Sequence, residues 1–192
     1  FEKYLLGCGI DYVRTREPGG SDGAEEIRSL IVKGEISRWS PETETLLFFA
    51  SRRDHTEKTI VPALEAGKVV ICDRFTDSTR VYQGLARSEI ADKVDNLQKL
   101  MINLEPDLTL ILDMDPGLAL KRGLARMSEE DRFENFGEEF QGKARNGFLD
   151  LSKKFPSRCK VVNANRDPDN ISTEIINLYL HLVQTKSQEK DI

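Results

Sequence analysis

The sequence predicts an α/β protein in which a parallel sheet is flanked by helices. The segments Lys68–Cys72 and Leu108–Leu112 are continuous apolar runs, too short for helices and typical of strands buried on both faces. Helix signals alternate with such runs along the chain, which is the pattern of a parallel sheet with crossover helices. The 192 residues, without repeats or a low-complexity linker, indicate one domain over 1–192.

The first half of the chain supplies helices with recognisable start and stop residues. Residues 1–8 are a helix end, and Asp11–Thr15 is a short strand. Ser21 is placed to cap a helix over about 22–33, which Gly34 ends. Further helices are predicted from Ser40-Pro41 to about Thr56, and over about 57–66.

The second half continues the alternation. A helix begins at Asp115-Pro116 and reaches about Arg126, after which the polar segment 127–137 is irregular. Three further elements are predicted: a helix over about 138–154, a strand over Cys159–Asn163 and a helix over Ile171–Val183. The tail TKSQEKDI is expected to fray.

Composition narrows the function classes. The net charge of −5 disfavours a protein that coats nucleic acid, and no apolar run reaches the roughly 18 residues needed to cross a membrane. The three cysteines are widely separated, and neither they nor the two histidines have zinc-ligand spacing. We therefore expect a cytoplasmic protein without structural metal, in which Cys72 is a reduced core residue.

Polar side chains follow three of the predicted strands. In open α/β sheets ligands bind beyond the carboxyl ends of the strands, so these clusters predict one cleft. The clusters are Arg16-Glu17, Asp73-Arg74 and the pair Asp113 and Asp115.

Two residues at the second strand end could handle phosphate. The guanidinium of Arg74 matches a phosphate bidentately, although an ion pair with Asp73 or Asp77 is the alternative. Asp73 is placed to hold Mg²⁺ directly or through water, and the alternative is a helix-capping aspartate.

Ring and donor pairs recur at helical spacing. Phe48 and Arg52 are four apart and share a face, where a ring can stack on a base and a guanidinium can bond its edge. On spacing alone, a core phenylalanine and a surface arginine are the better interpretation. Tyr82 and Gln83 follow Ser78 and Thr79 by one turn and offer a similar set.

Arg122 and Arg126 precede the irregular segment. They could close over transferring phosphates, or simply complement a helix C-terminus. His55 has no evident partner in the sequence, and we interpret it as structural or exposed.

Several motifs together resemble one family. TREPGG at 15–20, LLFFASR at 46–52, DRFTDSTRVYQG at 73–84, EPDLTLILDMDP at 105–116, DRFE at 131–134 and ARNGFLDL at 144–151 stand in the order found in bacterial thymidylate kinases. The resemblance covers essentially the whole chain. It implies a P-loop nucleoside monophosphate kinase-like fold with a short lid at about 123–137, and transfer of the γ-phosphoryl group of ATP to dTMP, with Mg²⁺, in a homodimer.

The resemblance also implies roles for individual residues. Phe48 would stack on thymine and Arg52 would bond its carbonyl edge, while Arg74 would bind the dTMP phosphate. The other implied contacts are Arg16 and Glu17 near the acceptor phosphate and sugar, Ser78 and Thr79 along the nucleotide, Tyr82 and Gln83 at the deoxyribose, Arg122 and Arg126 at the ATP phosphates, Asn163 and Ala164 at adenine, and Glu139 beside Mg²⁺.

One family feature is missing from the sequence. The phosphate loop G-x-x-x-x-G-K-[ST] does not occur, and we expect about thirty residues carrying it to precede residues 1–8. Two alternatives stay open: a dTMP-binding, dimer-forming remnant with little catalysis, and a related deoxynucleoside kinase.

Overall fold

The structure is a computed structural model that describes residues 1–86, 88–119 and 137–190. Strands and helices alternate through these residues, as the sequence predicts. In chain order the elements are α1 (Glu2–Gly7), β1 (Tyr12–Arg16), α2 (Asp22–Val32), the 3₁₀ turn η1 (Ile36–Arg38), α3 (Pro41–His55), the π-helical turn η2 (Thr56–Ile60), α4 (Val61–Glu65), β2 (Val69–Asp73), α5 (Thr76–Ala86), α6 (Ser88–Leu97), the π-helical turn η3 (Gln98–Ile102), β3 (Thr109–Asp113), α8 (Gly137–Lys154), β4 (Cys159–Asn163) and α9 (Pro168–Lys190).

The strands pair in parallel, in two ladders. β1 lies beside β2 with Arg16 opposite Asp73, and β3 lies beside β4 with Asp113 opposite Asn163. Within the described ranges these are two two-stranded sheets rather than the single sheet that we predicted. In each ladder the paired strands end at the same register, so their polar residues leave the sheet at one edge, where α/β proteins bind ligands.

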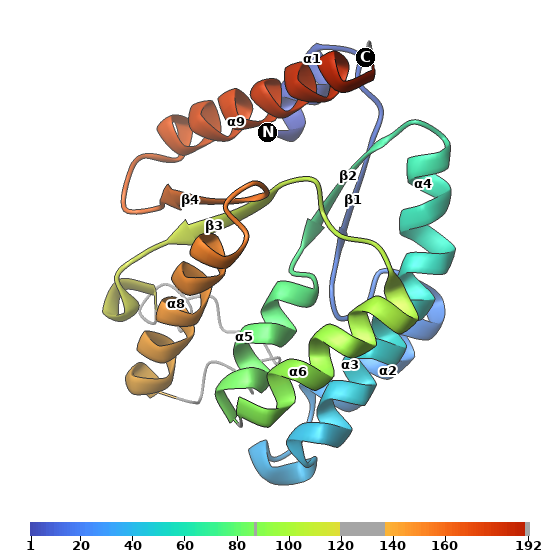
Figure 1. The fold of residues 1–192 in the computed structure, drawn as a ribbon, viewed down its shortest axis with the longest axis vertical. Coiled ribbons are helices and arrows are strands. Elements are labelled where there is room, and N and C mark those ends of the chain that lie inside the picture. Colours follow the sequence, from blue (N-terminus) through green and yellow to red (C-terminus); the bar gives the residue numbers. More distant parts are fainter. Residues whose placement is uncertain (87, 120–136, 191–192) are drawn as a thin grey trace.

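Helices cover the strands on two sides (Figure 1). α9 and α1 lie together beyond one side of the strands, while α5 and α8 lie on the other side with α2, α3 and α6. The rings of Phe1 and Tyr179 meet edge to face, with 5.2 Å between their centroids, and join α1 to α9. Both ends of the chain therefore lie on the same side of the molecule.

The starts of α2 and α3 show how local sequence sets the helix boundaries. Ser40 caps α3 as predicted, because its hydroxyl accepts from the amide of Thr43, and Pro41 occupies the first turn. Ser21 stands at the N-cap of α2 but donates to Asp54 instead. Asp54 also accepts from the amide of Ala24, so a side chain of α3 satisfies the start of α2.

Two apolar clusters hold α5 in place. Phe49 of α3 packs with Ile90, Val94 and Ile102, and the partly buried Phe75 joins this cluster at the start of α5. Val81 packs with Ala144 and Leu151 of α8, together with the ring of Tyr82. Each fully buried aliphatic or aromatic side chain contributes about 1.5–3 kcal/mol. α5 is thereby fixed between α3 and α8.

Two helical regions differ from the sequence predictions. Residues 76–86 and 88–97 form α5 and α6, for which the sequence analysis predicts no helix. α9 extends from Pro168 to Lys190 rather than over Ile171–Val183. The tail that we expected to fray is helical as far as the structure describes it. Among the described helices, none has the length and apolar character required to cross a membrane. The predicted lid at about 123–137 lies almost wholly outside the described residues.

Candidate functional site

The loop that follows β1 carries a buried carboxylate at its centre. Glu17 is only 5% exposed, and its backbone amide donates to the carbonyl of Asp73 at the end of β2. Its two carboxylate oxygens have different partners, both on α3. Oε2 accepts from Nε of Arg52 at 2.7 Å, and Oε1 lies 3.2 Å from Nδ1 of His55. A carboxylate at this depth needs such partners, since an unpaired buried charge is strongly unfavourable.

Arg52 is held from several directions. It is 1% exposed, which excludes the surface-charge interpretation of its spacing. Besides the bond to Glu17, its Nη2 donates to Oγ1 of Thr79 at 3.0 Å, and its guanidinium lies 4.9 and 5.3 Å from the ring centroids of Phe49 and Phe75. Nη1 is buried and has no hydrogen-bond partner among the described residues. A buried donor left unsatisfied costs about 1–3 kcal/mol, so Nη1 is suited to a ligand oxygen.

His55 is fully buried and has two partners, so the exposed interpretation is wrong. Nδ1 faces Glu17, and Nε2 lies 2.7 Å from Oγ1 of Thr15 on β1. Sequence reasoning missed this residue, although a signal was present. Phe48, Arg52 and His55 are at i, i+4 and i+7 and so lie along one face of α3.

Phe48 and Phe49 are adjacent but have different surroundings. Phe49 belongs to the core, whereas Phe48 is only partly buried. The core interpretation of an aromatic residue in LLFFASR therefore applies to Phe49. A partly exposed ring one turn before Arg52 remains suited to stacking on a planar base.

The loop after β2 and helix α5 contribute a second set of groups. Arg74 has φ of 66°, a left-handed conformation that is rare outside glycine and recurs at functional sites. Its guanidinium lies 5.2 Å from the ring centroid of Tyr82. Asp77, one of the two alternative partners of Arg74, is bound by Arg80 and Arg158.

The remaining predicted α5 residues differ in burial. Ser78 is partly buried, while Thr79 is buried and bound to Arg52. Gln83 is 3% exposed, and its amide donates to the carboxylate of Glu44 on α3 at 2.8 Å. Glu44 is a second residue that sequence reasoning missed, and its bond to Gln83 ties α5 to α3.

The carboxylates proposed for a metal occupy different settings. Asp73 at the end of β2 and Glu139 on α8 are both exposed. Glu139 differs in that its carboxylate accepts a hydrogen bond from Lys143 on the same helix. Arg16, at the neighbouring strand end, is paired with Glu25 of α2 at 3.1 Å. Exposed carboxylate oxygens are the ligands that Mg²⁺ prefers, so Asp73 fits that ion better than the paired Glu139.

A pocket of about 130 Å³ lies at the end of β3, lined by Tyr82, Asp113, Pro116, Arg145 and Phe148 among others. Arg145 of α8 binds both oxygens of Asp113, at 2.6 and 2.8 Å, and this hydrogen bonding lowers the pKa of that carboxyl. The other strand of this ladder ends at Asn163, whose side chain accepts from the amide of Asn165, and the following Ala164 is buried. The pocket thus connects Tyr82 with the edge where β3 and β4 end.

The geometry brings one part of the predicted site together. Glu17, Arg52 and Thr79 are directly bonded, Gln83 is tied to the same helix as Arg52, and Arg74 lies against Tyr82. Arg122 and Arg126 lie outside the described residues. The arrangement offers the ring of Phe48, the buried Nη1 donor of Arg52 and the guanidinium of Arg74. These groups suit a ligand that combines a flat neutral base with an anionic group.

Comparison with known proteins gives concordant results. The family model described as thymidylate kinase matches residues 1–175. A thymidylate kinase of Ruegeria pomeroyi is 54% identical over 183 residues, which are 95% of this chain and 87% of the relative. One from Jannaschia sp. is 60% identical over 172 residues, covering 90% and 83%. The crystal structure of thymidylate kinase from Ehrlichia chaffeensis superposes with a TM-score of 0.73 at 34% identity, covering 93% of this chain and 86% of that one.

Proposed function

The chain belongs to the thymidylate kinase family, and we propose that it transfers the γ-phosphoryl group of ATP to dTMP, giving dTDP and ADP. The observation that carries the proposal is the buried Arg52, whose Nη1 lacks a partner among the described residues while its other edge is fixed by Glu17 and Thr79. A base carbonyl is the natural acceptor for that donor. Phe48, one turn earlier on α3, stacks on the same base.

The acceptor is held at its other end by Arg74. Its guanidinium binds the dTMP phosphate, and Tyr82, on which Arg74 lies, packs against the deoxyribose. Ser78 lies along the nucleotide, Gln83 supports the sugar side through Glu44, and Arg16 and Glu17 border this end of the site. The left-handed backbone of Arg74 supports this role, because such conformations recur where a side chain must be aimed.

The reaction needs positioning more than proton transfer. A dTMP phosphate oxygen attacks the γ-phosphorus, and the bond from that phosphorus to the β–γ bridging oxygen breaks as ADP leaves. Arg122 and Arg126, at the beginning of the lid expected at about 123–137, neutralise charge on the transferring group. Mg²⁺, when bound, supplies further neutralisation, and Asp73 is the residue that would hold it, with Glu139 as the weaker candidate. Asn163 and Ala164 border the adenine.

We further propose a homodimer formed through the helices. Large apolar side chains are exposed on connected elements of one helical group, namely Leu30 on α2, Leu46 on α3, and Leu100 and Met101 on η3. Clustered exposed apolar groups are typical of interaction surfaces. The proposed compartment is the cytoplasm, where ATP is abundant and where free cysteines stay reduced.

The test is a coupled assay with dTMP, dUMP and thymidine as acceptors, comparing the wild type with Phe48→Ala. We expect turnover of dTMP, little of thymidine, and a KM for dTMP that rises about tenfold or more in the variant, because base stacking on an aromatic ring contributes about 1–3 kcal/mol. The KM for ATP should stay within about twofold.

Two outcomes contradict the proposal. Thymidine turnover that exceeds dTMP turnover would make the chain a deoxynucleoside kinase. If Phe48→Ala raised the KM for dTMP and the KM for ATP by the same factor, Phe48 would be a structural residue and not a base-stacking one. Arg53→Ala is the matched control on the same helix, because Arg53 is exposed and paired with Glu57.

A further inference from the structure

Four hydrogen bonds link β1, α3 and α5 in a line, which we call the orienting chain: Thr15, His55, Glu17, Arg52 and Thr79. Every member except the partly buried Thr15 is at most 5% exposed. The chain begins at Thr15 on β1 and ends at Thr79 on α5. It passes through the guanidinium of Arg52, whose Nη1 lacks a partner among the described residues. His55 is the link between the sheet and Glu17.

The direction of each bond follows from the donors available. An ionised carboxylate only accepts hydrogen bonds, so the Nδ1–H group of His55 donates to Oε1 of Glu17. In the neutral ring Nε2 then accepts, and the hydroxyl of Thr15 donates to it. Glu17 is thereby held by one oxygen, and its second oxygen faces Nε of Arg52. The guanidinium also lies against the rings of Phe49 and Phe75, which limits rotation of its plane.

We propose that His55 is a positioning residue that sets the base selectivity of the acceptor site, an inference that rests on the proposed function. His55 is fully buried and acts through Glu17 on Arg52 without touching the nucleotide. With Glu17 fixed, the N–H groups of Nη1 point in one direction, and they can donate only to a base that offers a carbonyl oxygen there. A base with an amino group at that position, as in dCMP, brings donor against donor and is rejected.

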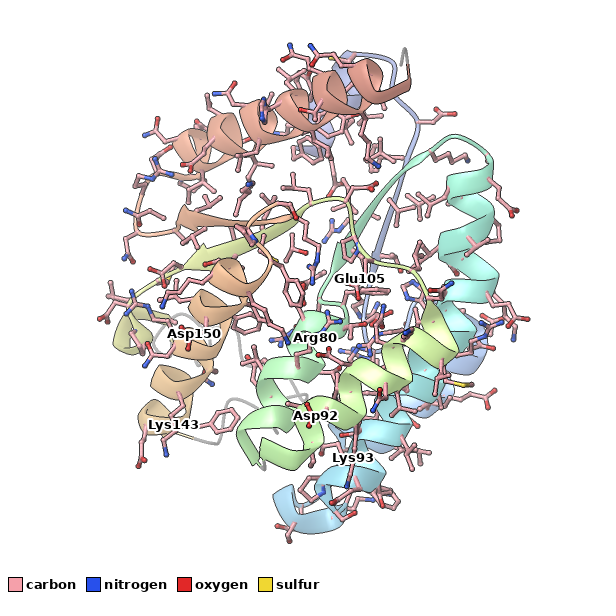
Figure 2. All side chains as sticks on the ribbon, viewed as in Figure 1. Arg80, Asp92, Lys93, Glu105, Lys143 and Asp150 are labelled. Atoms are coloured by element: carbon pink, nitrogen blue, oxygen red, sulfur yellow. The ribbon has the colours of Figure 1, made fainter. Side chains whose placement is uncertain are left out.

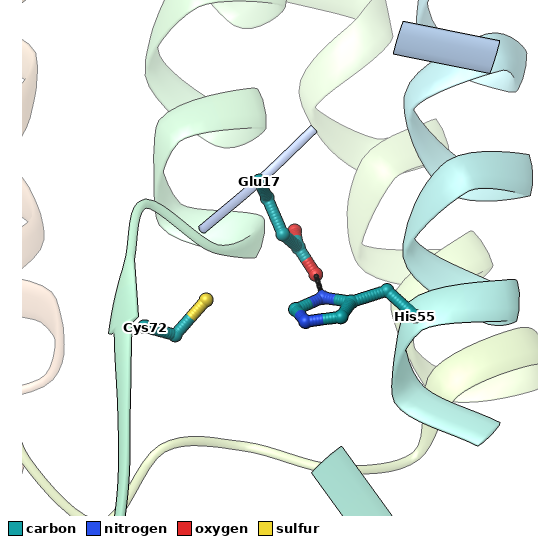
Figure 3. Close-up of side chains that lie close together, drawn as sticks. All are labelled: Glu17, His55 and Cys72. Atoms are coloured by element: carbon teal, nitrogen blue, oxygen red, sulfur yellow. Dashed lines mark hydrogen bonds and ion pairs between the residues drawn. The ribbon is translucent and has the colours of Figure 1, made fainter. Parts of the chain in front are cut away.

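The same residues could be interpreted as a metal site. The ligand atoms of Glu17, His55 and Cys72 lie within 4.8 Å of one another, and the Cys72 sulfur points toward the other two (Figure 3). Two observations disfavour a cation. Glu17 already binds the guanidinium of Arg52, and burial, followed by the charge of Glu17, raises the pKa of the Cys72 thiol well above its usual range. Thiol coordination requires the thiolate, which this environment opposes.

The experiment measures KM and kcat for dTMP, dCMP and ATP, together with dTMP binding by calorimetry, in the wild type and in His55→Leu, His55→Asn and Thr15→Val. His55→Leu removes both bonds of the ring. In His55→Asn the new side-chain amide can still donate to Glu17 in place of Nδ1–H, so this is the conservative variant. Thr15→Val removes only the far link and remains informative if His55→Leu does not fold. His181→Leu on α9, at the exposed second histidine, is the matched control.

We expect the KM and Kd for dTMP to rise about tenfold in His55→Leu and about threefold in Thr15→Val, with kcat and the KM for ATP within about twofold. The preference for dTMP over dCMP should narrow in His55→Leu and return toward the wild-type ratio in His55→Asn. If His55 had a purely structural role, His55→Leu would impair catalysis with dTMP, dCMP and ATP to the same extent. The preference for dTMP over dCMP would then be unchanged.

The outcomes separate the inference from the proposed function. A wild type that does not phosphorylate dTMP contradicts the proposed function. An active wild type whose dTMP affinity and base preference are the same in all three variants contradicts the role of His55 alone. A rise in melting temperature with Zn²⁺ that both His55→Leu and Cys72→Ser abolish makes the cluster a metal site and also overturns it.

Discussion

The glycines of TREPGG are required by the atoms that approach them. Gly19 and Gly20 have φ of 117° and 92°, in the region that side chains other than glycine rarely adopt. A Cβ at Gly20 would lie 2.4 Å from Nε2 of His55 and 2.5 Å from Oγ1 of Thr15. The loop therefore closes onto the first two members of the orienting chain.

We predict that Gly20→Ala destabilises the protein by about 3 kcal/mol, because it combines a left-handed backbone with a steric clash. Gly67→Ala separates the two effects: Gly67 has φ of 73° but nothing within 4 Å of a new Cβ, so about 1 kcal/mol is expected. Denaturant unfolding of both variants provides the measurement. If Gly20→Ala and Gly67→Ala lowered the free energy of unfolding equally, the contact with His55 would have no energetic consequence.

Arg52 shows how far residue-scale sequence reasoning reaches. Spacing correctly places Phe48 and Arg52 on one helix face, since that depends only on helical geometry. It does not predict that Arg52 is buried, because its counter-charge, Glu17, stands 35 residues away in the chain. The partners of His55 were missed for the same reason.

At the scale of elements, a group of ion pairs anchors α5 to the start of β4. Asp77 of α5 is bound by Arg158, just before β4, and by Arg80 one turn along α5. Arg80 also reaches Asp95 of α6 and Glu105 before β3, and Figure 2 shows Arg80 and Glu105 close together beside α5. Four segments are thus joined by this group of ion pairs. Removing one partner of such a buried group leaves an uncompensated charge.

We predict that Asp77→Asn lowers stability by about 3 kcal/mol at pH 7 and that this loss disappears in acid. Burial alone would raise the pKa of Asp77, but Arg158 and Arg80 outweigh it and the pKa is lowered. The stabilisation from the carboxylate is therefore complete above its unfolded pKa, near about 3.9, and is lost as the pH falls through the folded pKa.

Denaturant unfolding between pH 7 and pH 3 tests this, with the wild-type and Asp77→Asn curves converging below about pH 4. Asp150→Asn is the control, because Asp150 is exposed and its ion pair with Lys153 lies at the surface, so a loss under about 1 kcal/mol is expected. Curves for Asp77→Asn and the wild type that stay parallel through acid would contradict the assignment.

Strands could be predicted from the sequence where the local pattern of apolar residues was strong. The four strands are offset by at most one residue from their predicted bounds, because short apolar runs mark strands buried on both faces. α5 and α6 were not assigned, since their polar residues, including Asp77 and Arg80, are buried by pairing rather than by apolarity. The apolar pattern of a segment does not reveal a helix face that is buried through ion pairs.

At the scale of the whole molecule, α1 is joined to the far end of the chain. α1 contacts α9 through the rings of Phe1 and Tyr179, and Lys186 of α9 binds Asp107 before β3. The first and last described helices therefore stabilise each other across the sheet edge.

We predict that Tyr179→Ala destabilises the protein by about 1 kcal/mol and speeds amide hydrogen exchange in α1 before any other helix. Leu180→Ala, at an exposed neighbour on α9, is the matched control and should leave exchange in α1 unchanged. Hydrogen exchange followed by mass spectrometry measures the protection of α1 in both variants. Unchanged protection of α1 in Tyr179→Ala would place its stabilisation elsewhere, such as at Leu5 in the core.

The orienting chain also limits how the acceptor site can be altered by design. Arg52 and Glu17 form a buried pair of opposite charge, so replacing the arginine alone strands the carboxylate in the interior. His55→Leu is expected only to narrow the base preference, whereas reversing it means replacing Arg52. Arg52 therefore has to be replaced together with Glu17 and His55, by neutral groups of matching volume. Because the three positions come from two distant segments of the chain, single-site libraries along α3 would sample none of the viable combinations.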